Sequence, residues 1–67
     1  MCLSKVYVKD KTDNSVVADE AARIIETKDG VEVHTLFGES KTIEGCCIKE
    51  VDLLKNYVIL QRRGSGR

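Results

Sequence analysis

The chain contains short runs in which apolar and polar residues alternate, and two of its β-rich runs flank the dipeptide Asp29-Gly30. Residues 31–37 alternate cleanly after the dipeptide, and residues 24–27 before it are rich in β-branched side chains. A period of two places successive side chains on opposite faces of a strand, and Asp-Gly favours a tight hairpin turn. We therefore predict a strand–turn–strand hairpin centred on Asp29-Gly30.

Similar patterns predict strands elsewhere, at residues 5–9, 41–44, 46–53 and 57–60. The spacing of Ile48, Val51 and Leu53 is three and then two, which indicates a bulge after Ile48. Residues 10–15 are polar and predict a loop. Residues 16–22 are compatible with one helical turn or with an irregular entry to a strand.

Five or six strands at roughly ten-residue spacing predict an all-β fold. We expect a small SH3-like β-barrel, because closing the sheet removes exposed edges. An open meander completed by a partner is the alternative. Residues 1–61 form the single predicted domain, and residues 62–67, rich in Gly, Ser and Arg, are expected to be a flexible basic tail.

The chain has only 67 residues, so its core is small. Domains of this size bury about 60% of their unfolded surface and often need a metal, disulfides or a second subunit. The odd count of three cysteines and the lack of a signal sequence favour reduced thiols in the cytoplasm. No run of apolar residues is long enough to predict a membrane span.

Catalysis finds little support, and we predict that the chain is not an enzyme. His34 is the single histidine, and it is expected on a strand surface with Glu32 and Leu36. The adjacent thiols of Cys46 and Cys47 are expected on opposite faces of a strand, which disfavours chelation of one ion by both. No glycine-rich phosphate loop is present.

Nucleic-acid binding is disfavoured by the charge distribution. Without Arg62, Arg63 and Arg67 the chain has 8 basic and 11 acidic residues, a net charge of −3. A phosphate-binding surface is basic, and three aromatic residues provide few stacking surfaces. A small RNA-binding or protein-interaction module is nevertheless kept as the alternative function.

The N-terminal Met1-Cys2 is a potential metal chelator. If Met1 is retained, its amine, the Cys2 backbone nitrogen and the Cys2 thiolate form two fused five-membered rings around one ion. If Met1 is removed, the Cys2 amine and thiolate form one such ring. These nitrogen and sulfur donors suit square-planar Ni(II), and Cu(II) would bind as well or better.

Several segments together resemble the CooT family of small nickel-binding proteins: the Met1-Cys2 start before a strand, Thr35-Leu36-Phe37-Gly38-Glu39, and residues 45–53, which contain Val51-Asp52-Leu53. The similarity covers the chain up to the basic tail. It implies an SH3-like barrel, a homodimer and Ni(II) binding through Cys2. It also implies an accessory role, possible nickel chaperone activity for a nickel enzyme such as carbon monoxide dehydrogenase, and gives no role to Cys46, Cys47 or His34.

Overall fold

The computed structural model describes residues 3–9 and 12–63, which form an all-β fold. Its elements are β1 (Ser4–Val8), the 3-10 turn η1 (Asp13–Ser15), β2 (Val16–Glu26), β3 (Gly30–Thr35), β4 (Ser40–Glu44), β5 (Cys46–Asp52) and β6 (Tyr57–Arg62). The predicted fold class and the prediction of five or six strands are therefore confirmed.

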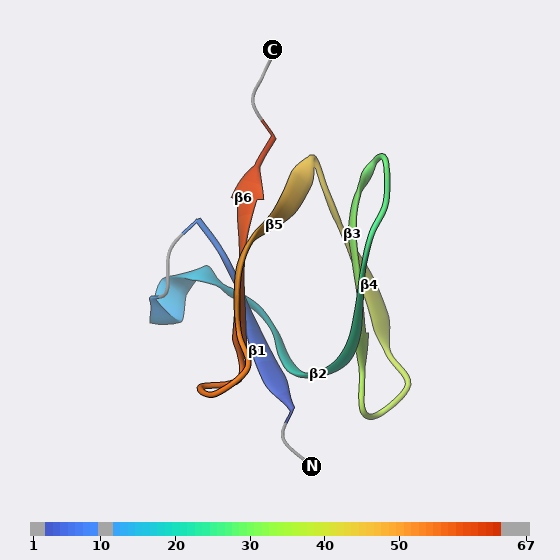
Figure 1. Ribbon diagram of the computed structural model, residues 1–67. Helices are drawn as coiled ribbons and strands as arrows, with labels where there is room; N and C mark the ends of the chain where they lie inside the picture. Colours follow the sequence, from blue (N-terminus) through green and yellow to red (C-terminus); the bar gives the residue numbers. More distant parts are fainter. Residues whose placement is uncertain (1–2, 10–11, 64–67) are drawn as a thin grey trace.

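All six strands belong to one sheet with the order β4-β3-β2-β1-β6-β5. Neighbouring strands are antiparallel except β1 and β6, which run parallel with Lys5 opposite Tyr57 and Val8 opposite Leu60. The first and last strands of the chain thus lie side by side in the middle of the sheet (Figure 1). The two ends of the folded chain stabilise each other through this pairing.

Strand β2 bends, and its two parts pair with different strands. Its first residues pair with β1, with Val16 opposite Tyr7 and Ala18 opposite Val6. Its later residues, from Ala21 to Glu26, pair with β3. Glu20 lies at the change of partner with a left-handed φ of 54°. Residues 16–22 are therefore strand, and Figure 1 shows β2 crossing from one half of the fold to the other.

The core lies between the two halves of the bent sheet. Val6, Val31, Val33 and Leu60 are fully buried, and they come from β1, β3 and β6. Further buried residues pack beside them: Ala21, Cys46 and Val58. Burial of these aliphatic side chains is the main source of stability, at about 25 cal/mol per Å² of apolar surface removed from water.

The expected closed barrel is not observed. The outer strands β4 and β5 are not paired with each other among the described residues, so the sheet remains open between them. The two strands are joined by the single residue Gly45, whose left-handed φ of 74° turns the chain sharply from one edge to the other. With no longer turn between them, β4 and β5 do not fold back onto each other as a hairpin.

Hydrogen bonds from Gly45 and from Arg63, the residue after β6, hold this end of the sheet against the β2–β3 turn. The Gly45 amide donates to Asp29 O at 3.0 Å, and the Arg63 amide donates to Gly45 O at 2.8 Å. The Arg63 guanidinium donates to Thr27 O and Lys28 O, both at 2.6 Å, and to Cys46 O at 3.3 Å. These contacts join the end of β6 to the β2–β3 turn.

Two residues assigned to the flexible tail are therefore part of the fold. Strand β6 includes Arg62, and Arg63 is anchored to the β2–β3 turn. This role of Arg63 is not predictable from the sequence, because an arginine that bonds main-chain carbonyls of a distant turn follows no recognisable spacing. Residues 64–67 lie outside the described part of the chain.

The β2–β3 hairpin is confirmed, although its turn is built differently from a two-residue Asp-Gly turn. Thr27 N donates to Gly30 O at 2.7 Å, and the Thr27 hydroxyl accepts from Gly30 N at 3.1 Å. Gly30 is needed for close packing, since a Cβ there would overlap the carbonyl oxygen of Ile43. The bulge predicted after Ile48 is also present, between Ile48 and Glu50.

Candidate functional site

The predicted metal ligands Met1 and Cys2 lie outside the described residues. The first described residue is Leu3, which is half-buried, and β1 begins directly after it at Ser4. Cys2 is therefore joined in sequence to the half-buried residue that precedes β1.

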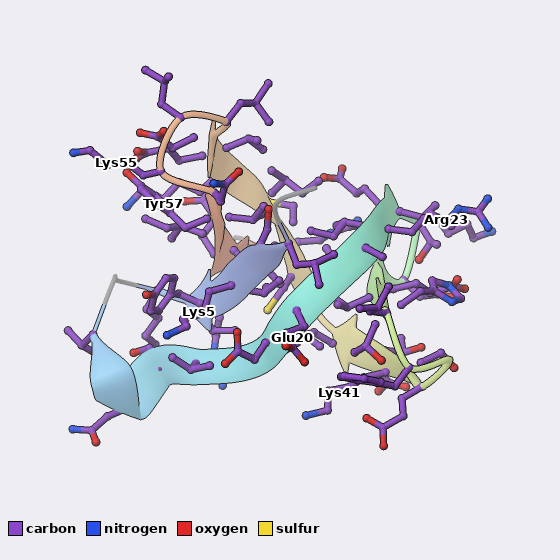
Figure 2. All side chains as sticks on the ribbon, turned by 90° about the horizontal axis from the view of Figure 1, so that it is seen from below. Lys5, Glu20, Arg23, Lys41, Lys55 and Tyr57 are labelled. Carbon is purple, nitrogen blue, oxygen red and sulfur yellow. The ribbon has the colours of Figure 1, made fainter. Side chains whose placement is uncertain are left out.

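A groove of about 350 Å³ lies beside this start of β1. Its lining comes from β1, β2 and the turn before β6: Leu3, Lys5, Tyr7, Asp19, Lys55, Asn56 and Tyr57. Lys5, Lys55 and Tyr57 are labelled in Figure 2 on this side of the molecule. The groove is mainly polar, and it combines two ammonium groups with two phenol rings.

The turn between β5 and β6 holds one wall of this groove. The Asp52 carboxylate accepts hydrogen bonds from Leu54 N at 3.0 Å and Lys55 N at 2.7 Å. Asn56 adopts a left-handed φ of 60°, and its carbonyl accepts a bond from Lys5 N at 3.1 Å. Asparagine tolerates this conformation, so the predicted turn at Lys55-Asn56 is locally encoded.

Tyr57 has the most perturbed environment of the described titratable residues. Its hydroxyl donates to Glu50 Oε2 at 2.6 Å, and its ring meets Tyr7 edge-on with centroids 6.3 Å apart. The hydrogen bond to Glu50 and the negative charge of that carboxylate raise the pKa of Tyr57 to about 12. The phenol of Tyr57 therefore ionises less readily than that of an ordinary tyrosine.

The two thiols of β5 occupy different environments, as the sequence predicted for neighbouring strand residues. Cys46 is buried in the core, and Cys47 is half-buried, with Gln61 Nε2 donating to its sulfur at 3.8 Å. Pairing with β6 opposes Cys46 to Arg62 and Cys47 to Gln61. The buried Cys46 is thus a packing residue.

His34 lies on the outer face of β3, on the same side as Glu32. Its Nε2 is 3.1 Å from Glu32 Oε1, and both side chains are partly exposed. The predicted surface position of His34 beside Glu32 is therefore confirmed. Within residues 3–9 and 12–63, no three His, Cys, Asp or Glu side chains gather in a group suited to a metal ion.

An exposed apolar surface covers the end of β5 and the following turn. Leu53 is 82% exposed, Leu54 is 93% exposed and Val51 is 50% exposed. A shallow groove of about 280 Å³ adjoins it, and its apolar lining comes from several strands: Ala21, Ala22, Ile24, Ile48 and Val58. We call this region the leucine surface, defined by Val51, Leu53 and Leu54.

Comparison with known proteins identifies the family. The family model described as CO dehydrogenase accessory protein CooT matches residues 1–61. The chain belongs to the CooT family. The resemblance noted in the sequence is therefore confirmed, and so is the prediction that the chain is not an enzyme, since the family is one of accessory proteins.

The structure agrees with this assignment at the level of the fold. A crystal structure assigned to CooT from Carboxydothermus hydrogenoformans superposes with a TM-score of 0.78 and 21% sequence identity. The match covers 94% of this chain and 100% of the other. No curated protein matches the chain.

Two further features bear on the expectations from the sequence about membrane spans and the basic tail. None of the helices in the described part of the chain is long and apolar enough to cross a membrane. The Arg63 guanidinium, which belongs to the predicted basic tail, is bonded to the Thr27 and Lys28 carbonyls. One of the three tail arginines is thus engaged within the fold.

Proposed function

We propose that this chain is a Ni(II)-binding accessory protein for CO dehydrogenase, with Cys2 as the key ligand and the Met1 amine as a second donor if Met1 is retained. Membership in a family of CO dehydrogenase accessory proteins carries the proposal. Nickel is the cargo in this scheme, and the chain holds it and passes it on. This role is that of a chaperone or store, and it needs no catalytic group.

The chemistry of the available donors supports Cys2 over the other thiols. Cys46 is enclosed by the core, and the neighbouring Cys47 accepts a hydrogen bond from Gln61. Cys2 has an amine or backbone nitrogen within the same small chelate ring. Thiolate and nitrogen donors together favour late divalent ions such as Ni(II), with Cu(II) as the strongest competitor.

Calorimetric titration with Ni(II) tests the assignment. Cys2→Ser is expected to abolish tight binding, while Cys47→Ser, which removes another accessible thiol, leaves the affinity within about twofold of wild type. Affinity should fall as the pH falls, because the thiolate must form before the metal binds. A sulfur-to-nickel charge-transfer band should disappear with Cys2→Ser. Equal affinities for wild type and Cys2→Ser would reject the assignment.

We also propose that the chain forms a homodimer through the leucine surface. Leu53 and Leu54 are more than four-fifths exposed, and an adjoining apolar groove provides a complementary depression. A twofold axis pairs the same patch on both subunits, which suits a surface that contains both a knob and a groove. Such a dimer would also contain two N-terminal donor sets, one from each subunit.

Light scattering and native mass spectrometry test the dimer. The double variant Leu53→Gln, Leu54→Gln is expected to shift the protein toward monomer, whereas Leu36→Gln, at another exposed leucine, leaves the dimer intact. If two chains share one ion, native spectra should contain a dimer with one nickel. A nickel complex that is strictly monomeric would contradict the shared site, while leaving Cys2 as the ligand.

A further inference from the structure

The first half of β2 has an open edge. Residues Val16–Glu20 pair with β1 on one side, and β3 joins β2 only from Ala21 onward among the described residues. The Val17 carbonyl points to the open side, where it accepts a hydrogen bond from Lys41 Nζ at 2.8 Å. Main-chain groups of an unpaired strand edge are available to pair with another extended chain.

A groove of about 690 Å³ lies along this edge. Its other wall is the β3–β4 hairpin, which presents the side chain of Phe37, 73% exposed. The full lining combines β2 residues with residues 35–41 of the hairpin: Val17, Ala18, Asp19, Glu20, Thr35, Phe37, Glu39, Ser40 and Lys41. Figure 2 labels Glu20 and Lys41, which line this groove from β2 and β4.

The hairpin wall is held in shape by its own hydrogen bonds. Thr35 N donates to Glu39 O at 2.9 Å, Glu39 N to the Thr35 hydroxyl at 3.2 Å, and Gly38 N to Thr35 O at 3.1 Å. Leu36 N donates to Glu20 O at 3.1 Å, which ties the hairpin to the bend of β2. The groove is therefore preformed between two fixed elements.

The charges around the groove are mostly negative. Asp19, Glu20 and Glu39 contribute three carboxylates, and all three residues are exposed. The single lysine of the lining, Lys41, already directs its ammonium group to the Val17 carbonyl. An occupant with positive side chains would be attracted, and one of like charge would be repelled.

We propose that this groove binds an extended basic segment of a partner protein, which pairs with the open edge of β2 as an added strand. Lysine or arginine side chains of the segment face Asp19 and Glu39, and its apolar side chains pack against Phe37. Added-strand recognition draws its affinity from main-chain hydrogen bonds and its specificity from alternate side chains. The proposal does not depend on nickel binding.

A second copy of this chain is a poorer occupant of the groove. Symmetric pairing of two β2 edges would bring Asp19 and Glu20 of one copy toward the same acidic residues of the other. Like charges placed opposite each other across a strand pair are destabilising. The uncharged side chains of the leucine surface suit self-association better, so the two surfaces are assigned to different partners.

The first test uses ¹⁵N-labelled full-length protein and a short capped peptide of alternating lysine and valine. Chemical-shift changes are expected at Val17–Glu20 and Leu36–Lys41, with slower amide exchange along residues 17–19. A peptide of alternating glutamate and valine serves as the control and should not bind. Equal binding of both peptides, shifts centred on the leucine surface, or no shifts would overturn the proposal.

Substitutions test whether the peptide is attracted by the carboxylates of the groove or by exposed carboxylates in general. Asp19→Asn with Glu39→Gln should weaken lysine-peptide binding about tenfold, since two exposed charges that attract the peptide are removed and each pair at the surface is weak. Asp29→Asn with Glu44→Gln removes the same charge on residues that do not line the groove and should change affinity less than twofold. Matching losses in the two double variants would count against the groove.

Lys41→Met is expected to raise the affinity for the lysine peptide, whereas the acidic substitutions lower it. The lysine competes for the Val17 carbonyl and repels a basic peptide, so its removal is expected to tighten lysine-peptide binding by about threefold to tenfold. Methionine retains much of the apolar stem of the side chain. Weaker binding by Lys41→Met would show that the peptide does not pair at this edge.

Discussion

At the scale of single residues, Tyr57 has a charge environment that the sequence did not indicate. Its hydroxyl and the Glu50 carboxylate are seven residues apart in the chain, and the β5–β6 hairpin brings them to 2.6 Å. The neutral phenol is a good donor to the carboxylate, whereas the phenolate would be repelled by it. The folded protein therefore favours the protonated form.

The titration of Tyr57 is a direct prediction. In a Tyr7→Phe background Tyr57 is the only tyrosine, and its absorbance change should have a midpoint near pH 12, the raised pKa. Glu50→Gln should lower this pKa toward 10, because it removes the negative charge. A midpoint near pH 10 in both proteins would show that the hydrogen bond does not persist in solution.

The same pKa shift has a consequence for stability. The pKa of Tyr57 is raised from 10 in the unfolded chain to about 12 in the fold. The contribution of the Tyr57–Glu50 interaction to the free energy of unfolding is therefore complete below pH 10, and it is lost as the pH rises from 10 to 12. Because the hydrogen bond between Tyr57 and Glu50 lies at the surface, this contribution to stability is small at high ionic strength.

At the scale of secondary-structure elements, Gly30 determines how closely β3 and β4 approach. Gly30 lies opposite Glu44 in the ladder, and it is buried. A Cβ at this position would overlap Ile43 O and would lie 2.9 Å from Glu44 Cα. The atoms in the way belong to the backbone, so a rotamer change cannot remove the overlap.

We expect Gly30→Ala to lower the free energy of unfolding by about 2–3 kcal/mol, because β4 must shift away from β3. Gly38→Ala is the matched control: a Cβ at Gly38 meets open space, but its φ of 88° is unfavourable for alanine. That control should cost about 1 kcal/mol. Urea denaturation measures both values. A smaller cost at Gly30 than at Gly38 would contradict the steric argument.

At the scale of the whole molecule, Arg63 ties the paired ends of β5 and β6 to the β2–β3 turn, with which neither strand pairs. Its guanidinium group reaches Thr27 and Lys28 in the β2–β3 turn and Cys46 at the start of β5. Arginine suits this position because its planar group offers several donors in a fixed arrangement. Side-chain hydrogen bonds thus hold this end of β5 and β6 against the β2–β3 turn.

Replacement of Arg63 by alanine should therefore destabilise the protein by about 1–2 kcal/mol, after allowance for the exposure of the hydrogen bonds. Arg62→Ala removes the same charge from the preceding residue and should cost less than about 0.5 kcal/mol. Hydrogen exchange at Gly45 and Gly30 should accelerate with Arg63→Ala. Equal effects of the two variants would mean that the Arg63 bonds to the β2–β3 turn do not stabilise the fold.

The sequence alone predicted the local features of this protein. Alternation identified the strands, the spacing around Ile48 located the bulge, and Asp29-Gly30 marked the hairpin, because these features depend on neighbouring residues. The conjunction of several segments identified the family. The N-terminal Met1-Cys2 donor set also comes from the sequence, since its chelate rings depend only on covalent connectivity.

The tertiary structure decided the long-range features. It showed that β1 and β6 pair in parallel, that β2 bends at Glu20 to serve two partners, and that the sheet stays open between β4 and β5. It also brought Tyr57 to Glu50, and it placed the Asp19 and Glu39 carboxylates along one groove. These arrangements depend on contacts between residues distant in the chain, and such contacts follow from packing the whole sheet around one core.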